Sequence, residues 1–108
     1  MFTNPLTFLW SEIFDSLQND DVQQSTVIGL PCLRVYDHII AALDSENASV
    51  IVKLPVHRVN YLVAEGWGHY FTTPSLTHQQ WIRVNHIEPA LWKELVQEAT
   101  RNASISLA

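Results

Sequence analysis

Apolar residues recur at helical spacing in three separate parts of the chain. The first stripe, which follows Asn4 and Pro5, consists of Leu6, Leu9, Trp10, Ile13, Phe14 and Leu17. These positions are three or four residues apart and share one face of a helix, and Asn before Pro is a favourable helix start. Shorter stripes begin after Pro55, where a helix should end before Gly66, and after Pro89. The pattern predicts three amphipathic helices.

Short apolar runs separated by polar turns predict strands between these helices. The clearest run, Ser49–Leu54, is rich in β-branched residues and ends at Pro55, which has no N–H for a sheet hydrogen bond. Further strands are predicted at 26–36, 39–43, 67–71 and 81–85, with a turn at 37–38 and polar loops at 19–25 and 72–79. We expect an α+β two-layer sandwich with helices on one face of an antiparallel sheet of four to five strands, in the order α-β-β-β-α-β-β-α.

Length and composition predict one globular domain over residues 1–108, with a tail that frays beyond about Asn102. Hydrophobic residues make up 47% of the chain and charged residues 16%, as in ordinary folded proteins. The longest apolar run, Ile39–Leu43, is far shorter than a membrane span, and no basic residue precedes the first apolar residues as in a signal peptide. Cys32 is the single cysteine, so no internal disulfide can form. We expect a cytoplasmic protein without membrane association, as a monomer or weak homodimer.

Two segments resemble the YjbR/MmcQ-like proteins, a family of small bacterial proteins: VIVKLPVHRVNYLVAEGWGHYF and WIRVNHIEPALWKELVQEA. The resemblance covers residues 49–99 and, more loosely, the first strands. It rests on the strand–Leu–Pro–helix junction, the Trp81 strand and the helix start at Pro89–Trp92. It implies a frataxin-like fold, also described as a double-wing DNA-binding motif, and it supplies no catalytic residues. The chain departs from the family pattern in its first hairpin turn, where residues 36–38 replace a frequent Gly-Lys, and at Gln80, where some branches carry His.

The predicted sheet has one face without helices, and basic and aromatic residues gather there. If Leu33, Val52, Leu54, Ile82 and Val84 face the helices, the opposite face carries Arg34, Tyr36, Lys53, Trp81 and Arg83. Cations beside aromatic rings suit nucleotides, single strands and anionic ligands. The alternative is a solvated sheet face in which Trp81 shields the backbone. The formal net charge of −5 argues against general binding of nucleic acid.

Two further groups of residues were considered as metal sites. Three histidines around the last strands are His69, His78 and His86, which could hold zinc. Frataxin-like proteins carry an acidic ridge for iron on their first helix, and the corresponding acids here are Glu12, Asp15, Asp20 and Asp21. The histidines lack the spacing of a known metal motif, and the acids offer few converging oxygens. We interpret both groups as surface residues and predict no metal and no cofactor.

No constellation of catalytic residues stands out in the sequence. Cys32 and His38 are conceivable as a nucleophile and base, but a lone cysteine is most often a small buried hydrophobe. The chain has no GxSxG motif, Gly-rich phosphate loop or paired carboxylates. We therefore predict a binding module, not an enzyme, for a protein partner or a small anionic ligand at the open face and the 72–79 loop. The alternatives are double-wing DNA binding through the same face and, more remotely, a metal-dependent enzyme.

Overall fold

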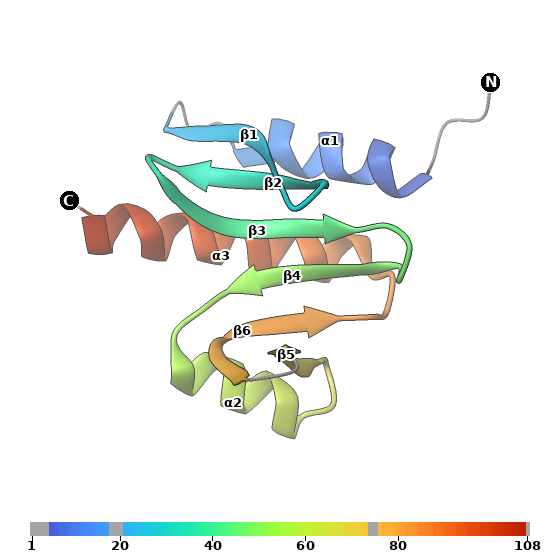
Figure 1. Cartoon of the computed structure of the whole chain (residues 1–108), viewed down its shortest axis with the longest axis vertical. Helices are drawn as coiled ribbons and strands as arrows, with labels where there is room; N and C mark the ends of the chain where they lie inside the picture. Colours follow the sequence, from blue (N-terminus) through green and yellow to red (C-terminus); the bar gives the residue numbers. More distant parts are fainter. Residues whose placement is uncertain (1–4, 18–20, 74–75, 108) are drawn as a thin grey trace.

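The computed structural model of the chain describes residues 5–17, 21–73 and 76–107 (Figure 1). Three helices are present in these ranges: α1 (Pro5–Leu17), α2 (Val56–Ala64) and α3 (Pro89–Leu107). The strands are β1 (Val22–Val27), β2 (Leu30–Val35), β3 (His38–Asp44), β4 (Ser49–Lys53), β5 (His69–Thr73) and β6 (Leu76–Val84). The three helices predicted from the apolar stripes are confirmed. Helix α3 continues past Asn102, where we expected the tail to begin to fray.

The six strands form one antiparallel sheet in the order β1-β2-β3-β4-β6-β5. Strands β1 to β4 follow one another as hairpins, α2 connects β4 to β5, and β6 returns to lie between β4 and β5. The α+β class is confirmed. The predicted four to five strands and the predicted element order are wrong, because the described residues form six strands in the order α-β-β-β-β-α-β-β-α.

The additional strand comes from the segment predicted as a loop at 19–25 and a single strand at 26–36. A turn at Ile28 and Gly29, with φ of 49° and 77°, divides this segment into β1 and β2. Two successive residues with positive φ suit a tight hairpin because they match the twist of the flanking strands. Strand β1 was missed because its sequence, VQQSTV, has one fully buried side chain, Val22, and little apolar alternation. The part of the predicted loop at 18–20 lies outside the described residues.

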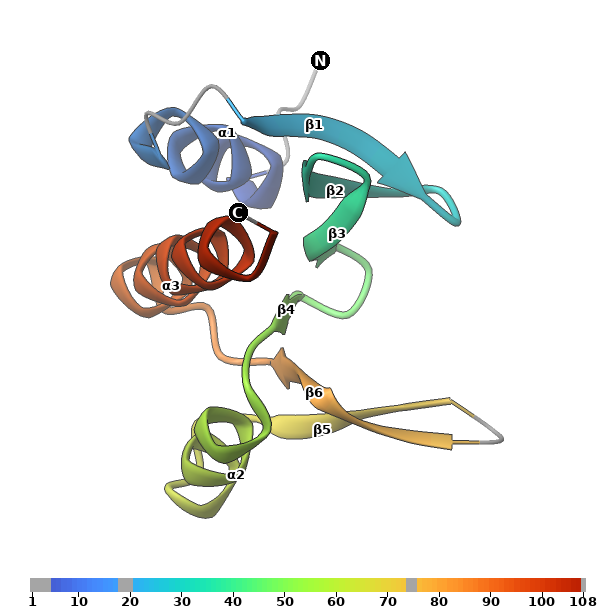
Figure 2. The same ribbon diagram turned by 90° about the vertical axis from the view of Figure 1, so that its left-hand side faces the viewer.

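The segment predicted as a loop at 72–79 belongs largely to the β5–β6 hairpin. Tyr70 pairs with Ile82, but the next residue, Phe71, pairs with His78. Three residues of β6, at 79–81, are therefore extra relative to β5, and such a bulge bends the strands. Figure 2 shows that this hairpin and the β1–β2 hairpin both bend toward the side of the sheet away from α1 and α3. Residues 74 and 75 lie outside the described residues.

One hydrophobic core fills the space between the sheet and the helices. Its residues include the five sheet positions predicted to face the helices, which are Leu33, Val52, Leu54, Ile82 and Val84. Helix α3 packs on β3 and β4, α1 packs on α3, and α2 packs on β6 (Figure 2). Trp92 is completely buried, and its indole Nε1 donates a hydrogen bond to the carbonyl of His86 at 2.7 Å. The predicted placement of helices on one face is therefore correct.

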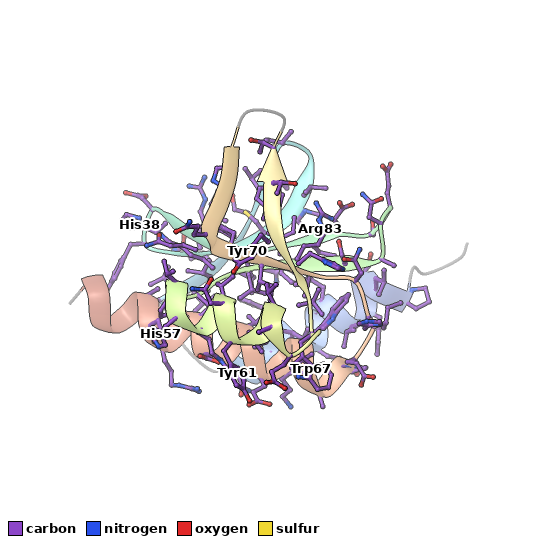
Figure 3. All side chains as sticks on the ribbon, turned by 90° about the horizontal axis from the view of Figure 1, so that it is seen from below. His38, His57, Tyr61, Trp67, Tyr70 and Arg83 are labelled. Carbon is purple, nitrogen blue, oxygen red and sulfur yellow. The ribbon has the colours of Figure 1, made fainter. Side chains whose placement is uncertain are left out.

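The ends of α2 follow from the residues around them. Pro55 occupies the N-cap position, and Gly66 has a φ of 82° just past the helix end, as expected of a residue there. Gly68 then lets the chain pass closely beside β6, because a Cβ at this position would lie 2.7 Å from the carbonyl oxygen of Arg83. Tyr70 lies between α2 and the β5–β6 hairpin, and its hydroxyl donates to Asn60 Oδ1 (Figure 3). No helix in the described ranges is both long and apolar enough to cross a membrane.

Candidate functional site on the open sheet face

Four of the five predicted site residues lie on the sheet face opposite the helices. Lys53 on β4 pairs with Trp81 on β6, and Arg83 pairs with Ile51 one step further along these strands. Arg34 pairs with Ile39 across β2 and β3. Arg34, Lys53 and Arg83 each lie between two core residues, and Trp81 precedes the core residue Ile82, so the four side chains lie on the other side of the sheet.

Tyr36 lies apart from these four residues. We predicted it at the end of a strand before a turn at 37–38, but Tyr36 and Asp37 form the turn, and His38 already begins β3. Tyr36 has a φ of 55°, is exposed, and its hydroxyl donates to Asp21 Oδ2 at 3.5 Å. Placing Tyr36 on the sheet face was wrong, because the two-residue turn begins one position earlier than the polar residues suggested.

The centre of the open face is a row of small and apolar side chains. Cys32, Ala42 and Ile51 lie side by side on β2, β3 and β4, and their exposed fractions are 0%, 5% and 5%. They are buried although no helix covers them, so this part of the face is not a uniformly solvated surface. Cys32 is inaccessible, and His38 pairs with Val35, so the sequence-based pairing of Cys32 with His38 is not formed.

Arg83 is held by groups of the protein itself. Its Nη1 donates to Asp44 Oδ2 at 2.9 Å and to Ser49 Oγ at 2.7 Å, and its guanidinium lies 5.6 Å from the centre of the Phe71 ring. The hydrogen bond from the Asn47 side chain, at 2.8 Å, is the main reason that the pKa of Asp44 lies below its usual range, and the bond from Arg83 adds to it. Arg83 therefore ties β6 to β3 and β4 and already has its counter-ion.

Arg34 and Lys53 have no carboxylate partner among the described residues. The ion pairs in that part of the chain are Arg83–Asp44 and Arg58–Glu98. Arg34 is half-buried, and its Nε is buried without a hydrogen-bond partner. A buried donor without a partner is costly, but because this atom is covered, a ligand could contact only the exposed part of the Arg34 side chain. The open face thus retains two cations that are available to an anion.

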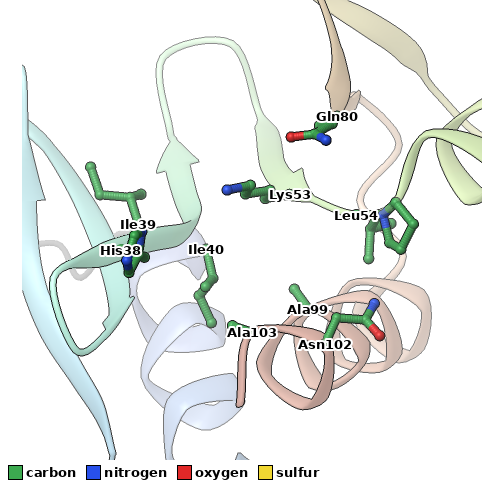
Figure 4. A pocket seen from close by; sticks show the side chains of 10 residues that line it. His38, Ile39, Ile40, Lys53, Leu54, Gln80, Ala99, Asn102 and Ala103 are labelled. Atoms are coloured by element: carbon green, nitrogen blue, oxygen red, sulfur yellow. The ribbon is translucent and has the colours of Figure 1, made fainter. Parts of the chain in front are cut away.

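A pocket of about 360 Å³ lies where β3 and β4 separate (Figure 4). The pairing of these strands ends at Ala41 and Val52, although β3 starts three residues earlier, at His38, and β4 continues to Lys53. Near this opening the register between β2 and β3 shifts: Leu33 pairs with Ala41 but Arg34 pairs with Ile39. Ile40 is the residue without a partner on β2, and it belongs to the hydrophobic core. The apolar part of the lining includes Ile40, Leu54, Ala99 and Ala103, and the polar part consists of His38, Lys53, Gln80 and Asn102.

The sequence analysis assigned Lys53 to the open face but did not predict this pocket. Its lining comes from β3, β4, β6 and α3, which are brought together only by the fold. One local signal was present: Ala99 and Ala103 are one turn apart on α3, where earlier positions of the stripe carry large residues such as Trp92 and Leu95. Two small residues on a core-facing stripe leave room beside the helix.

The predicted metal candidates do not come together in the described part of the chain. No three side chains of His, Cys, Asp or Glu there are grouped so that they could hold a metal ion. His69 pairs with Arg83, and the ring of His78 lies 5.5 Å from the ring of Phe71. Glu12 and Asp15 are exposed on α1, and Asp20 lies outside the described residues.

Comparison of the chain with models of protein families, with curated proteins and with solved structures found no match. The resemblance to the YjbR/MmcQ-like proteins therefore stays a prediction that rests on the two quoted segments. What the chain does has to be inferred from the geometry described above.

Proposed function

We propose that this protein is a binding module that recognises a small anionic ligand on the open sheet face. The observation that carries the proposal is the pair of cations on this face, Arg34 and Lys53, that lack a carboxylate partner among the described residues. Trp81, paired with Lys53, offers an aromatic ring beside the cation. A charged ligand group would gain charge-assisted hydrogen bonds there, which are stronger than neutral ones.

A small ligand fits these groups better than DNA does. Affinity for duplex DNA depends on neutralising several phosphates, and the chain has a net charge of −5. Of the three basic residues on the open face, Arg83 is already paired with Asp44. Two cations match one or two anionic groups, as a small molecule provides. An acidic protein partner would meet the same two cations, and it is one outcome of the test below.

The proposal predicts specific changes in an amide and indole NMR spectrum. Acetate, inorganic phosphate and a short single-stranded oligonucleotide would be titrated separately into the full chain at low salt. Small anions should shift the signals of Arg34, Lys53 and the Trp81 indole. The variants Arg34→Gln and Lys53→Gln should each weaken binding by about tenfold, which is the loss of one charge-assisted hydrogen bond.

Lys93→Gln and Arg101→Gln serve as matched controls, because both residues are exposed on α3, away from the open face. These variants should bind the anions as the unchanged protein does. Binding of the oligonucleotide alone, with a steep loss of affinity on addition of salt, would favour the DNA alternative. If neither small anions nor the oligonucleotide shift the signals, the open face has to be tested with acidic peptides and the proposal for small anions is wrong.

A further inference from the structure

We infer that the pocket between β3, β4 and α3 binds the apolar tail of a small monocarboxylic acid, whose carboxylate pairs with Lys53. This inference rests on the proposed function and names its ligand class. It extends the site from the open face into the space beneath it, because Lys53 belongs to both. The ligand would be an acid with an aliphatic or aromatic tail.

The interior of the pocket is apolar and is formed largely by residues of the hydrophobic core and of α3. Ile40 and Leu54 are almost completely buried members of the hydrophobic core, and Ala99 and Ala103 line the pocket from α3. Its volume of about 360 Å³ falls within the range of about 300 to 1,000 Å³ that is usual for small-molecule sites. The pocket therefore has the size and the lining to remove an apolar tail from water.

The opening results from a specific arrangement of the backbone. Beyond Ala41 and Val52 the two strands no longer pair, although β4 remains joined to β6, since the Leu54 amide donates to the carbonyl of Gln80 at 3.0 Å. Protein interiors are normally close-packed, and core side chains next to unfilled space lose van der Waals contacts. A larger residue at Ala99 or Ala103 would fill this space. The small residues keep it open at a place where the sheet is already parted.

The rim of the pocket supplies the charge. Lys53 is half-buried, and Figure 4 shows its side chain extending from β4 toward the side where β3 carries His38 and Ile39. Among the described residues the lining contains no Asp or Glu, so none of them supplies a counter-ion to the ammonium group there. Asn102 and Gln80 add amide groups that can donate to an oxygen atom. One lysine, one histidine and two neutral amides at the rim match the single charge of a carboxylate, whereas a phosphate dianion calls for more cationic donors.

Titration of the full chain with three probes tests the inference. The probes are octanoate, which has both tail and charge, acetate, which has the charge alone, and octanol, which has the tail alone. NMR shifts should appear at Ile40 and Leu54 with octanoate. Octanoate should bind at least tenfold more tightly than acetate, because each buried methylene contributes about fourfold in affinity. It should also bind at least tenfold more tightly than octanol, which forms no ion pair with Lys53.

Two variants separate the tail from the charge. Ala103→Leu, which fills the pocket from α3, should weaken the binding of octanoate by at least tenfold and leave the binding of acetate unchanged. Ala90→Leu is its matched control, because Ala90 is an exposed residue of the same helix. Lys53→Gln should weaken the binding of octanoate and of acetate but not the binding of octanol. Intermolecular NOEs from the octanoate methyl group to Ile40 and Leu54 in the unchanged protein provide a second test that does not depend on the folding of any variant.

The outcomes distinguish this inference from the proposed function. Equal affinity for acetate and octanoate, with no NOE into the pocket, would overturn the inference about the tail and leave anion binding at the open face intact. Octanol that binds as tightly as octanoate would show an apolar site without carboxylate selectivity and would also overturn the inference. No binding of any carboxylate, together with no response to phosphate, would overturn both.

Discussion

At the scale of single residues, Asp44 shows how the open face is held together. Its side chain is 11% exposed and accepts hydrogen bonds from Asn47 and Arg83. Desolvation alone would raise the pKa of this carboxyl group, but the hydrogen bond from Asn47 and the pairing with Arg83 outweigh it, and the pKa is lowered. The ionised form is thus the one that the fold stabilises.

This lowered pKa predicts how stability depends on pH. Because Asp44 has a lower pKa in the folded than in the unfolded protein, its contribution is fully present above the unfolded value of 3.8 and is lost as the pH falls through the folded value. Asp44→Asn should cost about 1 to 3 kcal/mol at neutral pH and should flatten the acid side of the stability curve. Urea unfolding measured from pH 7 to pH 3 checks this. Asp15→Asn, at an exposed site on α1, should change neither the stability at neutral pH nor the acid side of the curve.

At the scale of elements, the sequence predicted best where one face of an element is continuously apolar. The stripe that ends at Leu17 gave α1, and the β-branched run before Pro55 gave β4. The pattern failed at edge strands such as β1, where Val22 is the one fully buried side chain and burial does not impose alternation. At β5–β6 the predicted strands at 67–71 and 81–85 overlap the two observed strands, but the segment 72–79 between them was predicted as a loop, because a three-residue register shift breaks the period of two.

The candidate site, too, was predictable only where a strand has one continuously apolar face. The sidedness of Arg34, Lys53, Trp81 and Arg83 was predictable, because each directly adjoins at least one core residue on its strand. The counter-ion of Arg83 was not predictable, since Asp44 is 39 residues away in the chain. The pocket was not predictable either, because it depends on where two strands stop pairing, and no local pattern encodes that.

The β1–β2 hairpin carries a conformational cost that a substitution can remove. Ile28 is 96% exposed and has a φ of 49°, a conformation that β-branched residues rarely adopt. Ile28→Asn would create Asn-Gly, the preferred pair for this kind of turn. We expect a gain in stability of about 1 kcal/mol. Thermal and urea unfolding would measure it, with Ile87→Asn as the control, because Ile87 is also exposed but does not have a positive φ.

No gain from Ile28→Asn, or the same gain from Ile87→Asn, would mean that the backbone at this turn is not strained and that the removal of an exposed apolar side chain explains any effect.

At the scale of the whole molecule, a single core joins every helix to the sheet. Such a domain should unfold in one cooperative transition. Its four tryptophans, Trp10, Trp67, Trp81 and Trp92, are spread along the chain, so fluorescence reports on several regions while circular dichroism reports on the backbone. The two transitions should coincide in urea. Leu95→Ala, at a completely buried site on α3, should shift both together by about 2 to 5 kcal/mol.

A smaller loss is expected for Leu91→Ala, because Leu91 is only half-buried on the same helix. A fluorescence transition that precedes the loss of circular dichroism, or a Leu95→Ala effect on only one of the two signals, would show that the helical layer and the sheet unfold separately.

The polar character of β1 has a consequence for the protein in concentrated solution. Among the described strands, β1 and β5 lie at the two edges of the sheet, and exposed edges are templates for pairing with strands of other molecules. Gln23, Gln24 and Thr26 are exposed along β1, and β5 has five residues with a register shift in its middle. Neither edge is a long, flat, apolar strand. The polar sequence of β1, which kept this strand from being predicted, should therefore also disfavour edge-to-edge aggregation.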